Sequence, residues 1–273
     1  MNSLLDFLTE LYNSGLSYSA VNTARSAVSA VFLSKGDQEK IGSNPIICRF
    51  LKGVFELRTP LPRKEIWDVN ILLKHILDMP ENYKLDLKSL TKKLCALLML
   101  TTAQRVQTLR VFKLSCMRIT SAGCTIKIVD KLKHTRQGHH QEDLALSKFP
   151  EGKLCVINCL NDYIARTKCI RKGEDILFLC YAKPHGPASK DTLARWLKAI
   201  LQDAGITDFT AHSFRSVASS AMAKAGVSIQ DIMKNAGWTN AGTFYKFYYK
   251  PVKGQNKESN ENTILKYFDN SKS

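Results

Sequence analysis

The chain has 273 residues, 44% of them hydrophobic, which is enough for one large domain or two smaller ones with a real core and excludes a disordered protein. Forty Lys and Arg against 24 Asp and Glu leave a net charge of +16, which favours a polyanionic partner, with nucleic acid first. The sequence holds no signal-peptide pattern and no run of about 18 apolar residues, so we expect a soluble intracellular protein with no membrane partner.

The first 60 residues predict a helical unit. Its expected helices cover residues 1–15, 17–32 and 45–57. Apolar residues recur on one face of each, Ser17 can cap the second helix, and Asn44 with Pro45 forms the N-cap and first position of the third. Pro60 and Pro62 then enforce an extended crossing, which predicts a boundary between two parts of the chain.

The second part predicts helices around one small antiparallel sheet. Helical patterns cover residues 68–79, 87–102, 155–168 and 192–205, and two short helices separated by Gly226 are expected within 211–249. Strand patterns cover residues 116–120, 124–130 and 142–147, with a polar hairpin tip at 131–140 and a short apolar segment at 176–180. The expected fold class is therefore mainly α with a small antiparallel β-sheet (α+β).

The cysteines predict no metal centre. Eight are scattered without a CxxC pair, and most lie in apolar stretches, so we expect reduced, buried thiols. Cys155 and Cys159 share a helix face, but no His or Cys follows at the spacing of a zinc finger.

Residues 211–249 gather chemistry that a helical core does not explain: His212, Arg215, Trp238 and a group of Phe and Tyr rings near the end. If the partner is DNA, cleavage of a phosphodiester without a metal needs cations on the non-bridging oxygens, a nucleophile and a proton donor for the leaving oxygen. Arginine suits the first task because its planar fork meets two phosphate oxygens and keeps its charge.

Five motifs in order carry a family resemblance. They are TTAQRVQTL, KLKHTRQG, AHSFR, AGWTN and FYYKP, with 238 − 215 = 23 residues between the second arginine and the tryptophan. This order resembles the tyrosine recombinases, the phage-integrase and Cre-like family, from about Leu4 to Pro251. The stretches LPRKEIWDV and TFYKFYYKP look more like the recombinases of DIRS-type and related eukaryotic mobile elements.

The resemblance implies roles for four residues of these motifs. Arg105 and Arg215 match the two family arginines that clamp the scissile phosphate. His212, one helical turn before Arg215, matches the histidine that handles protons around the attacking phenol. Trp238 stands where family members carry His or Trp, and its indole N–H can donate to a phosphate oxygen.

The lysine and the tyrosine each leave alternatives. The family places a lysine on a β-hairpin as the acid for the leaving 5′ oxygen; Lys133 is preferred here and Lys131 is the alternative, although the tip could also be a basic finger on the DNA backbone. Three tyrosines are available as the nucleophile, Tyr245, Tyr248 and Tyr249. The interval usual in the family lands on Phe247, so the nucleophile is predicted as Tyr248, the tyrosine that follows it, with Tyr249 second.

The resemblance also implies an organisation of the chain. It gives a SAM-like helical core-binding domain over 1–59, a linker over 60–65, a catalytic domain over 66–252 and a polar linker with a tail segment over 253–273. Two features depart from the family: Thr108 stands where an acidic residue is usual, and the N-terminal part is short. We therefore expect either an incomplete DNA-embracing half or a fragment of a longer element protein.

The predicted function is a site-specific DNA recombinase or integrase that works through a 3′-phosphotyrosyl intermediate without metal or nucleotide cofactor. Its expected partners are double-stranded DNA and further copies of itself in a homo-tetramer, and the apolar ILKYF near the end could dock on a neighbouring protomer. Nuclear residence follows only from the eukaryotic-element resemblance. The alternative is a catalytically silent, element-derived DNA-binding protein; a type IB topoisomerase and a basic RNA binder fit less well.

Overall fold

The computed structural model describes residues 2–33, 41–58, 65–132, 135, 137, 141–238, 242 and 244–249. The chain forms two compact units, Met1–Lys64 and Glu65–Ser273, and each has hydrophobic clusters of its own. The division falls within the residues predicted as a linker. The roles assigned to the two units remain predictions.

The smaller unit contains the three helices predicted from the sequence. Its elements are α1 (Asn2–Asn13), α2 (Tyr18–Leu33), the short η1 (Ile41–Ser43) and α3 (Pro45–Leu57). Each α-helix contributes one fully buried residue to a shared hydrophobic cluster: Leu8, Val21 and Ile47. The Asn44 side chain accepts a hydrogen bond from the Ile46 N–H (2.9 Å), with Pro45 at the first helical position, as the sequence indicated.

The larger unit is mostly helical and carries one small sheet. Its helical elements before the sheet are α4 (Val69–Asp78), η2 (Asn82–Lys84), α5 (Leu87–Thr102), α6 (Val106–Arg110) and η3 (Leu114–Cys116). The strands are β1 (Met117–Ile119), β2 (Gly123–Ile126) and β3 (Leu144–Ser147). They are followed by α7 (Val156–Thr167), η4 (Lys168–Ile170), α8 (Lys190–Asp203), α9 (Ser213–Lys224), α10 (Ile229–Ala236) and the π-helical turn η5 (Phe244–Tyr248). The predicted fold class is confirmed.

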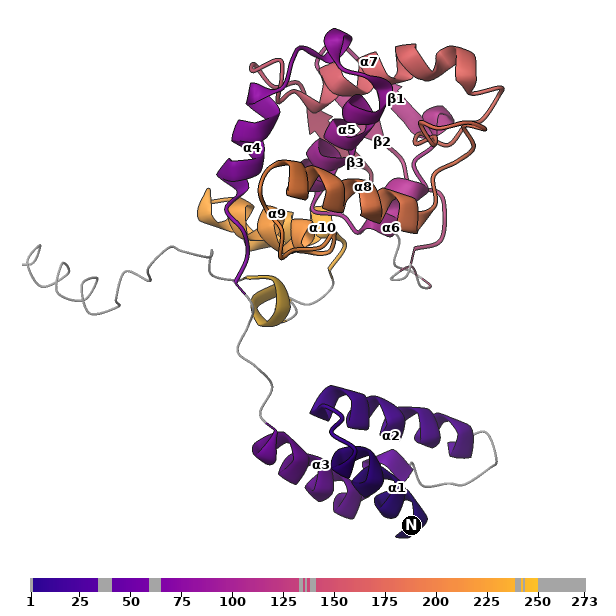
Figure 1. Cartoon of the computed structure of the whole chain (residues 1–273), viewed down its shortest axis with the longest axis vertical. Helices are drawn as coiled ribbons and strands as arrows, with labels where there is room; N and C mark the ends of the chain where they lie inside the picture. The colour runs from indigo at the N-terminus through magenta and orange to yellow at the C-terminus, as the bar shows by residue number, and fades with distance from the viewer. Residues whose placement is uncertain are drawn as a thin grey trace, which may run out of the picture. The chain divides into compact units, whose positions relative to one another are not determined.

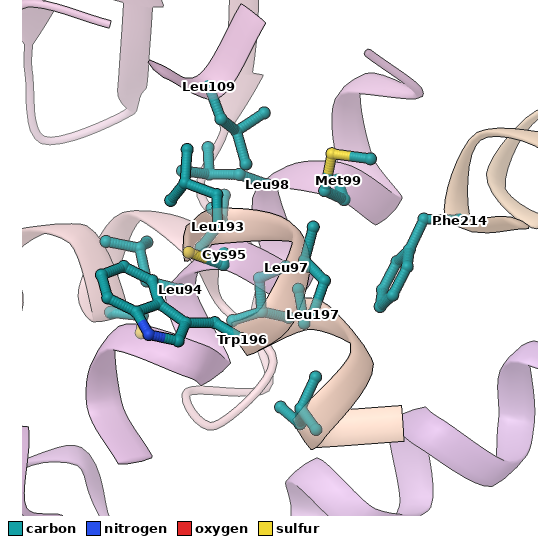
Figure 2. Packing of buried hydrophobic residues seen from close by; sticks show 14 of the residues in the cluster. Leu94, Cys95, Leu97, Leu98, Met99, Leu109, Leu193, Trp196, Leu197 and Phe214 are labelled. Atoms are coloured by element: carbon teal, nitrogen blue, oxygen red, sulfur yellow. The ribbon is translucent and has the colours of Figure 1, made fainter. Parts of the chain in front are cut away.

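Helix α5 forms the middle of the larger unit and packs against α7, α8 and α9 (Figure 1). It begins where the Asp86 side chain accepts from the Ser89 N–H (2.7 Å), and its residues from Leu90 to Met99 are all buried. A helix that is apolar on most sides is expected to be surrounded by protein. Figure 2 shows its side chains beside Leu193 and Trp196 of α8.

The sheet has the order β1-β2-β3 with both pairs antiparallel. Gly123 opens β2 where a Cβ atom would lie 2.2 Å from the Leu146 carbonyl oxygen, so only glycine fits this close approach. Strand β2 ends at Ile126, and the prediction that it continues to residue 130 is wrong. The register pairs Ile126 with Leu144, and the residues just before β3 contact α10, where Gln141 donates to the Lys234 carbonyl oxygen and the Glu142 carboxylate pairs with the Lys234 ammonium.

The cysteines are all free thiols, and only some are buried. Cys95, Cys124, Cys155 and Cys159 are buried as expected, and burial raises the pKa of Cys159 to about 12. The expectation of burial is wrong for Cys48 and Cys169, which are exposed. Helix α3 buries its face through Ile47, Leu51 and Val54, which leaves Cys48 on the other side.

Candidate active site

Arg215 lies at the centre of the candidate site, on the buried side of α9. Its side chain is 1% exposed. Nη1 donates to the Ala103 carbonyl oxygen (2.8 Å), and Nη2 donates to the Ala236 carbonyl oxygen (2.7 Å). The guanidinium carbon lies 4.4 Å from the centre of the Trp238 ring. Neutral carbonyls and a ring face therefore orient the guanidinium without cancelling its charge.

The electrostatic environment of Arg215 is unfavourable for a cation. The pKa of Arg215 is lowered to about 10, first by burial and then by the charge of Arg105, against an opposing contribution from Tyr248. Arg215 is still protonated at neutral pH. Its Nε atom is buried without a hydrogen-bond partner among the described residues, and so is Nε1 of Trp238. Buried donors without partners are rare in proteins, and both of these would suit the oxygens of an anion.

Arg105 reaches the same place from the turn between α5 and α6. Ala103 adopts a left-handed conformation (φ 49°) that ends α5, and Arg105 is the N-cap residue of α6. Arg105, His212 and Arg215 together line an open pocket of about 480 Å³. The structure thus brings both predicted arginines and the predicted histidine to one cavity.

Tyr248 lies against three of the other predicted site residues. Its ring centre is 4.5 Å from that of Trp238 and 6.1 Å from that of His212, and the Arg215 guanidinium carbon is 5.3 Å from it. The Tyr248 carbonyl oxygen accepts from Ser220 Oγ on α9 (2.8 Å), which fixes the backbone beneath the ring. Trp238 itself is 7% exposed, whereas His212 is exposed.

The two alternative tyrosines have other neighbours. Tyr245 and Tyr249 are 49% and 45% exposed. Their ring contacts within the described residues are with Phe244 (5.2 and 5.6 Å) and with each other (6.1 Å). Phe244 is fully buried beside Trp238, so it holds the turn η5 in place. The geometry therefore favours Tyr248 over Tyr245 and Tyr249.

The predicted lysine, Lys133, lies outside the described residues. The alternative, Lys131, is exposed just before it. On the return side of the hairpin, the Gln141 Nε2 donates to the Lys234 carbonyl oxygen (3.4 Å), and Glu142 pairs with the Lys234 ammonium (2.9 Å). The segment that leads from Gln141 into β3 is thereby attached to α10.

Sequence reasoning missed two features of the site. Gln104 is fully buried and donates through Nε2 to the Asn235 carbonyl oxygen, while its Oε1 accepts from Thr108 Oγ1 (3.0 Å). The only local signal for it was the four-residue spacing of Gln104 and Thr108.

The second missed feature is a basic edge on α8, where Lys190, Arg195 and Lys198 line the pocket beside the arginines. Lys190, Ala194 and Lys198 recur every four residues, so they lie along one side of the helix. That spacing is visible in the sequence and would have predicted a cationic stripe.

The described residues contain no group of three or more His, Cys, Asp or Glu that could hold a metal ion. Within the same residues, the helices are too short or too polar to cross a bilayer.

Comparison with known proteins identifies relatives of the larger unit. Residues 72–254 match the phage integrase family. No curated protein sequence matches the chain.

Similar solved structures include three DNA complexes. The XerH site-specific recombinase in a post-cleavage complex with palindromic difH substrate shares 16% identity at a TM-score of 0.64, over 88% of this chain and 66% of that one. The Tn1549 transposon integrase in complex with a circular intermediate DNA shares 14% identity at a TM-score of 0.59, over 98% of this chain and 84% of that one.

The third structure is a lambda integrase tetramer bound to a Holliday junction, with 15% identity and a TM-score of 0.56, over 94% of this chain and 66% of that one. The chain thus spans about two thirds of the length of the XerH and lambda integrase chains. At these identities the likeness establishes a shared fold.

Proposed function

The chain belongs to the phage integrase family, and from that membership we propose that it is a site-specific recombinase that breaks and rejoins DNA through a tyrosine nucleophile. One observation carries the proposal: the Tyr248 ring lies in contact with Trp238, Arg215 and His212. A phenol beside a buried cation, an indole donor and an imidazole is the set of groups that metal-free phosphoryl transfer needs.

In the proposed reaction, a backbone phosphate enters the pocket between the two arginines. Arg105 and Arg215 bind its non-bridging oxygens, and Trp238 Nε1 donates to one of them. The Tyr248 oxygen attacks phosphorus while its proton passes to His212. The bond from phosphorus to the 5′ oxygen breaks, and that oxygen leaves with a proton from Lys133. The products are a 3′-phosphotyrosyl bond and a free 5′ hydroxyl.

Rejoining reverses these steps with a different strand. The 5′ hydroxyl of the incoming strand attacks the phosphotyrosyl phosphorus, its proton returns to the lysine, and Tyr248 leaves as the phenol with the proton held by His212. The phosphotyrosyl bond conserves the energy of the broken diester, so the reaction needs no nucleotide. Each group is used in both directions, as microscopic reversibility demands.

The charge distribution supports DNA as the partner. The net charge is +16, and Lys190, Arg195 and Lys198 continue the cationic lining of the pocket along α8. Phosphates on either side of the cleaved one would meet this edge. The lambda integrase tetramer on a Holliday junction supports the proposal that this chain also assembles as a tetramer on two duplexes. A mobile-element origin and nuclear residence stay predictions.

The test is formation of a covalent protein–DNA adduct. Duplexes from a random-sequence pool are selected for binding to the full chain and rebuilt with a nick beside each candidate scissile phosphate, so that the cleaved end diffuses away and the adduct is trapped. Adducts are then resolved on a denaturing gel for wild type, Tyr248→Phe, Tyr249→Phe and Tyr245→Phe. We expect loss of the band in Tyr248→Phe alone.

Two other outcomes would change the proposal in different ways. Loss in Tyr249→Phe or Tyr245→Phe instead would move the nucleophile and keep the function. Salt-sensitive binding without any adduct in wild type would contradict recombinase activity and would favour the catalytically silent DNA-binding protein.

A further inference from the structure

The carboxyl-terminal turn of α10 contacts three separate parts of the candidate site. Its last carbonyls point away from the helix because a helix leaves its final C=O groups without partners, and Gly237 ends it in the left-handed conformation (φ 65°). Three consecutive carbonyl oxygens each accept a side-chain donor: Lys234 from Gln141, Asn235 from Gln104 and Ala236 from Arg215. Arg105, His212, Arg215 and Trp238 therefore each lie within three residues of this turn or of one of its donors in the sequence.

Gln104 ties the Arg105 turn to α10. The Asn235 carbonyl oxygen can only accept, so it fixes Nε2 as the atom of the amide that faces it, and Oε1 is left to accept from Thr108 Oγ1 (3.0 Å). The Gln104 backbone N–H lies 3.3 Å from Thr102 Oγ1, so the residue is held on both sides. Arg215 bridges the same two segments through Ala103 and Ala236. The turn that carries Arg105 is therefore set relative to Arg215 by a neutral amide next to it.

Gln141 connects the predicted hairpin to α10, as Gln104 connects the Arg105 turn to it. Gln141 is 8% exposed, its Nε2 donates to the Lys234 carbonyl oxygen, and the neighbouring Glu142 pairs with the Lys234 side chain. Lys133 precedes Gln141 in the sequence, in the stretch predicted to be the tip of a hairpin. A shift of Gln141 relative to α10 would move the hairpin base and leave the arginine pair untouched.

We propose that Gln104 and Gln141 are positioning residues that act through the last turn of α10, Gln104 on the arginine pair and Gln141 on the predicted hairpin whose sequence contains the lysine. This inference rests on the proposed recombinase function. Neither side chain needs to touch DNA. The two act on different steps of the reaction, because the arginines stabilise the phosphate and the lysine protonates the leaving oxygen.

A change of the leaving atom separates these two effects. When sulfur replaces the bridging 5′ oxygen at the scissile phosphate, the Tyr248 oxygen still forms its bond to phosphorus. The P–S bond then breaks, and the thiolate leaves with the bonding pair. A thiolate is a far weaker base than an alkoxide, so it needs no proton donor. Misplacement of the lysine should then cease to matter, while misplacement of the arginines should matter as before.

The experiment compares Gln104→Met, Gln141→Met and the matched control Gln230→Met, which makes the same change at an exposed position of α10. Adduct formation is measured in single turnover at saturating selected DNA, with oxygen and with sulfur at the bridging position, beside DNA affinity and Tm. We expect Gln104→Met to slow both substrates by about tenfold to a hundredfold. Gln141→Met should slow the oxygen substrate by a similar factor and match wild type on sulfur, and the control should match wild type on both.

Several results would overturn the inference. A wild-type rate of adduct formation for Gln104→Met at saturating DNA would contradict it, and so would a Gln104→Met variant that loses only DNA affinity. A slow rate for Gln141→Met that persists on the sulfur substrate would also contradict it. If Gln104→Met does not fold, Thr108→Val serves, because it removes the hydroxyl that donates to Gln104 Oε1 and places no charge beside Arg105 and Arg215. An absence of adduct in wild type would contradict the proposed function and the positioning roles together, whereas an active wild type with equally active variants would contradict only the latter.

Discussion

Replacing Arg105 by Gln should stabilise the protein while abolishing its activity. Burial and the charge of Arg105 lower the pKa of Arg215 to about 10. Its proton affinity is therefore more than a hundredfold lower than that of an ordinary arginine. At about 1.4 kcal/mol for each tenfold, holding Arg215 charged costs the fold roughly 3 kcal/mol. Burial is the larger cause and Arg105 the second, so repulsion between the two arginines accounts for on the order of 1 kcal/mol.

Because the pKa of Arg215 is lowered and not raised, varying the pH between 5 and 8 cannot reveal how much the charged Arg215 destabilises the fold. A base whose folded-state pKa is depressed destabilises the fold at every pH below that value, and the penalty fades only as pH rises from about 10 towards the ordinary arginine range. Stability at pH 5 to 8 therefore contains the full penalty. Ionic strength is the better variable, because Arg105 is partly exposed in an open pocket that salt ions can enter, and about 1 M salt shortens the screening length in solvent to roughly 3 Å.

Thermal unfolding at low and high sodium chloride tests the argument. For a unit of this size, about 1 kcal/mol corresponds to a rise in Tm of about 2–4 °C, so Arg105→Gln should exceed wild type by that margin at low salt and approach it at high salt. Arg110→Gln is the matched control, since Arg110 is exposed at the end of the same helix α6. A Tm below wild type for Arg105→Gln, or an equal rise for Arg110→Gln, would refute the reasoning.

Three further predictions concern single contacts. Lys198→Gln should weaken binding to selected DNA and reduce the slope of log affinity against log salt by about one, measured by fluorescence anisotropy over a salt series. Ser220→Ala removes the donor to the Tyr248 carbonyl oxygen and should slow adduct formation at saturating DNA without changing DNA affinity. Trp238→Phe keeps a ring beneath Arg215 but loses an indole N–H that has no partner among the described residues. The smaller ring should lower stability to urea by about 1–2 kcal/mol through lost packing, while adduct formation at saturating DNA slows by about tenfold or more.

Much of the larger unit was predictable because its signals are local. The apolar run after Asp86 predicted α5, and the cap and burial found there follow from that run. Gly226 separates α9 from α10 with a positive φ of 84°, as the break in the pattern indicated. The order of motifs also picked out Arg105, His212, Arg215, Trp238 and Tyr248, and the structure places these side chains around one pocket and one ring cluster.

The connections between those residues were not predictable. Gln104 and Asn235 are 131 residues apart, and Gln141 and Lys234 are 93 apart, so no periodicity links them. A buried amide in a turn has no sequence pattern of its own, because its partner is a backbone carbonyl that every residue carries. The end of β2 was misjudged because β-branched alternation continues past Ile126, where the strand ends, and the contacts of Gln141 and Glu142 with Lys234 of α10 leave no local pattern in the sequence.

The same connections account for Thr108 at a position where an acidic residue is usual in the family. Among the described residues that line the pocket, none is Asp or Glu, although Arg105, Arg215 and three cations of α8 meet there. A carboxylate beside Arg215 would stabilise the free protein and neutralise the guanidinium before a phosphate arrived. The carbonyls of Ala103 and Ala236 orient Arg215 and leave its charge in place, and the neutral pair Gln104 and Thr108 does the same for the turn that carries Arg105. The charge of Arg105 thus disfavours the charged form of Arg215, and a phosphate that enters between the two relieves this repulsion. The phosphate also accepts from Arg215 Nε and Trp238 Nε1, which have no hydrogen-bond partner among the described residues.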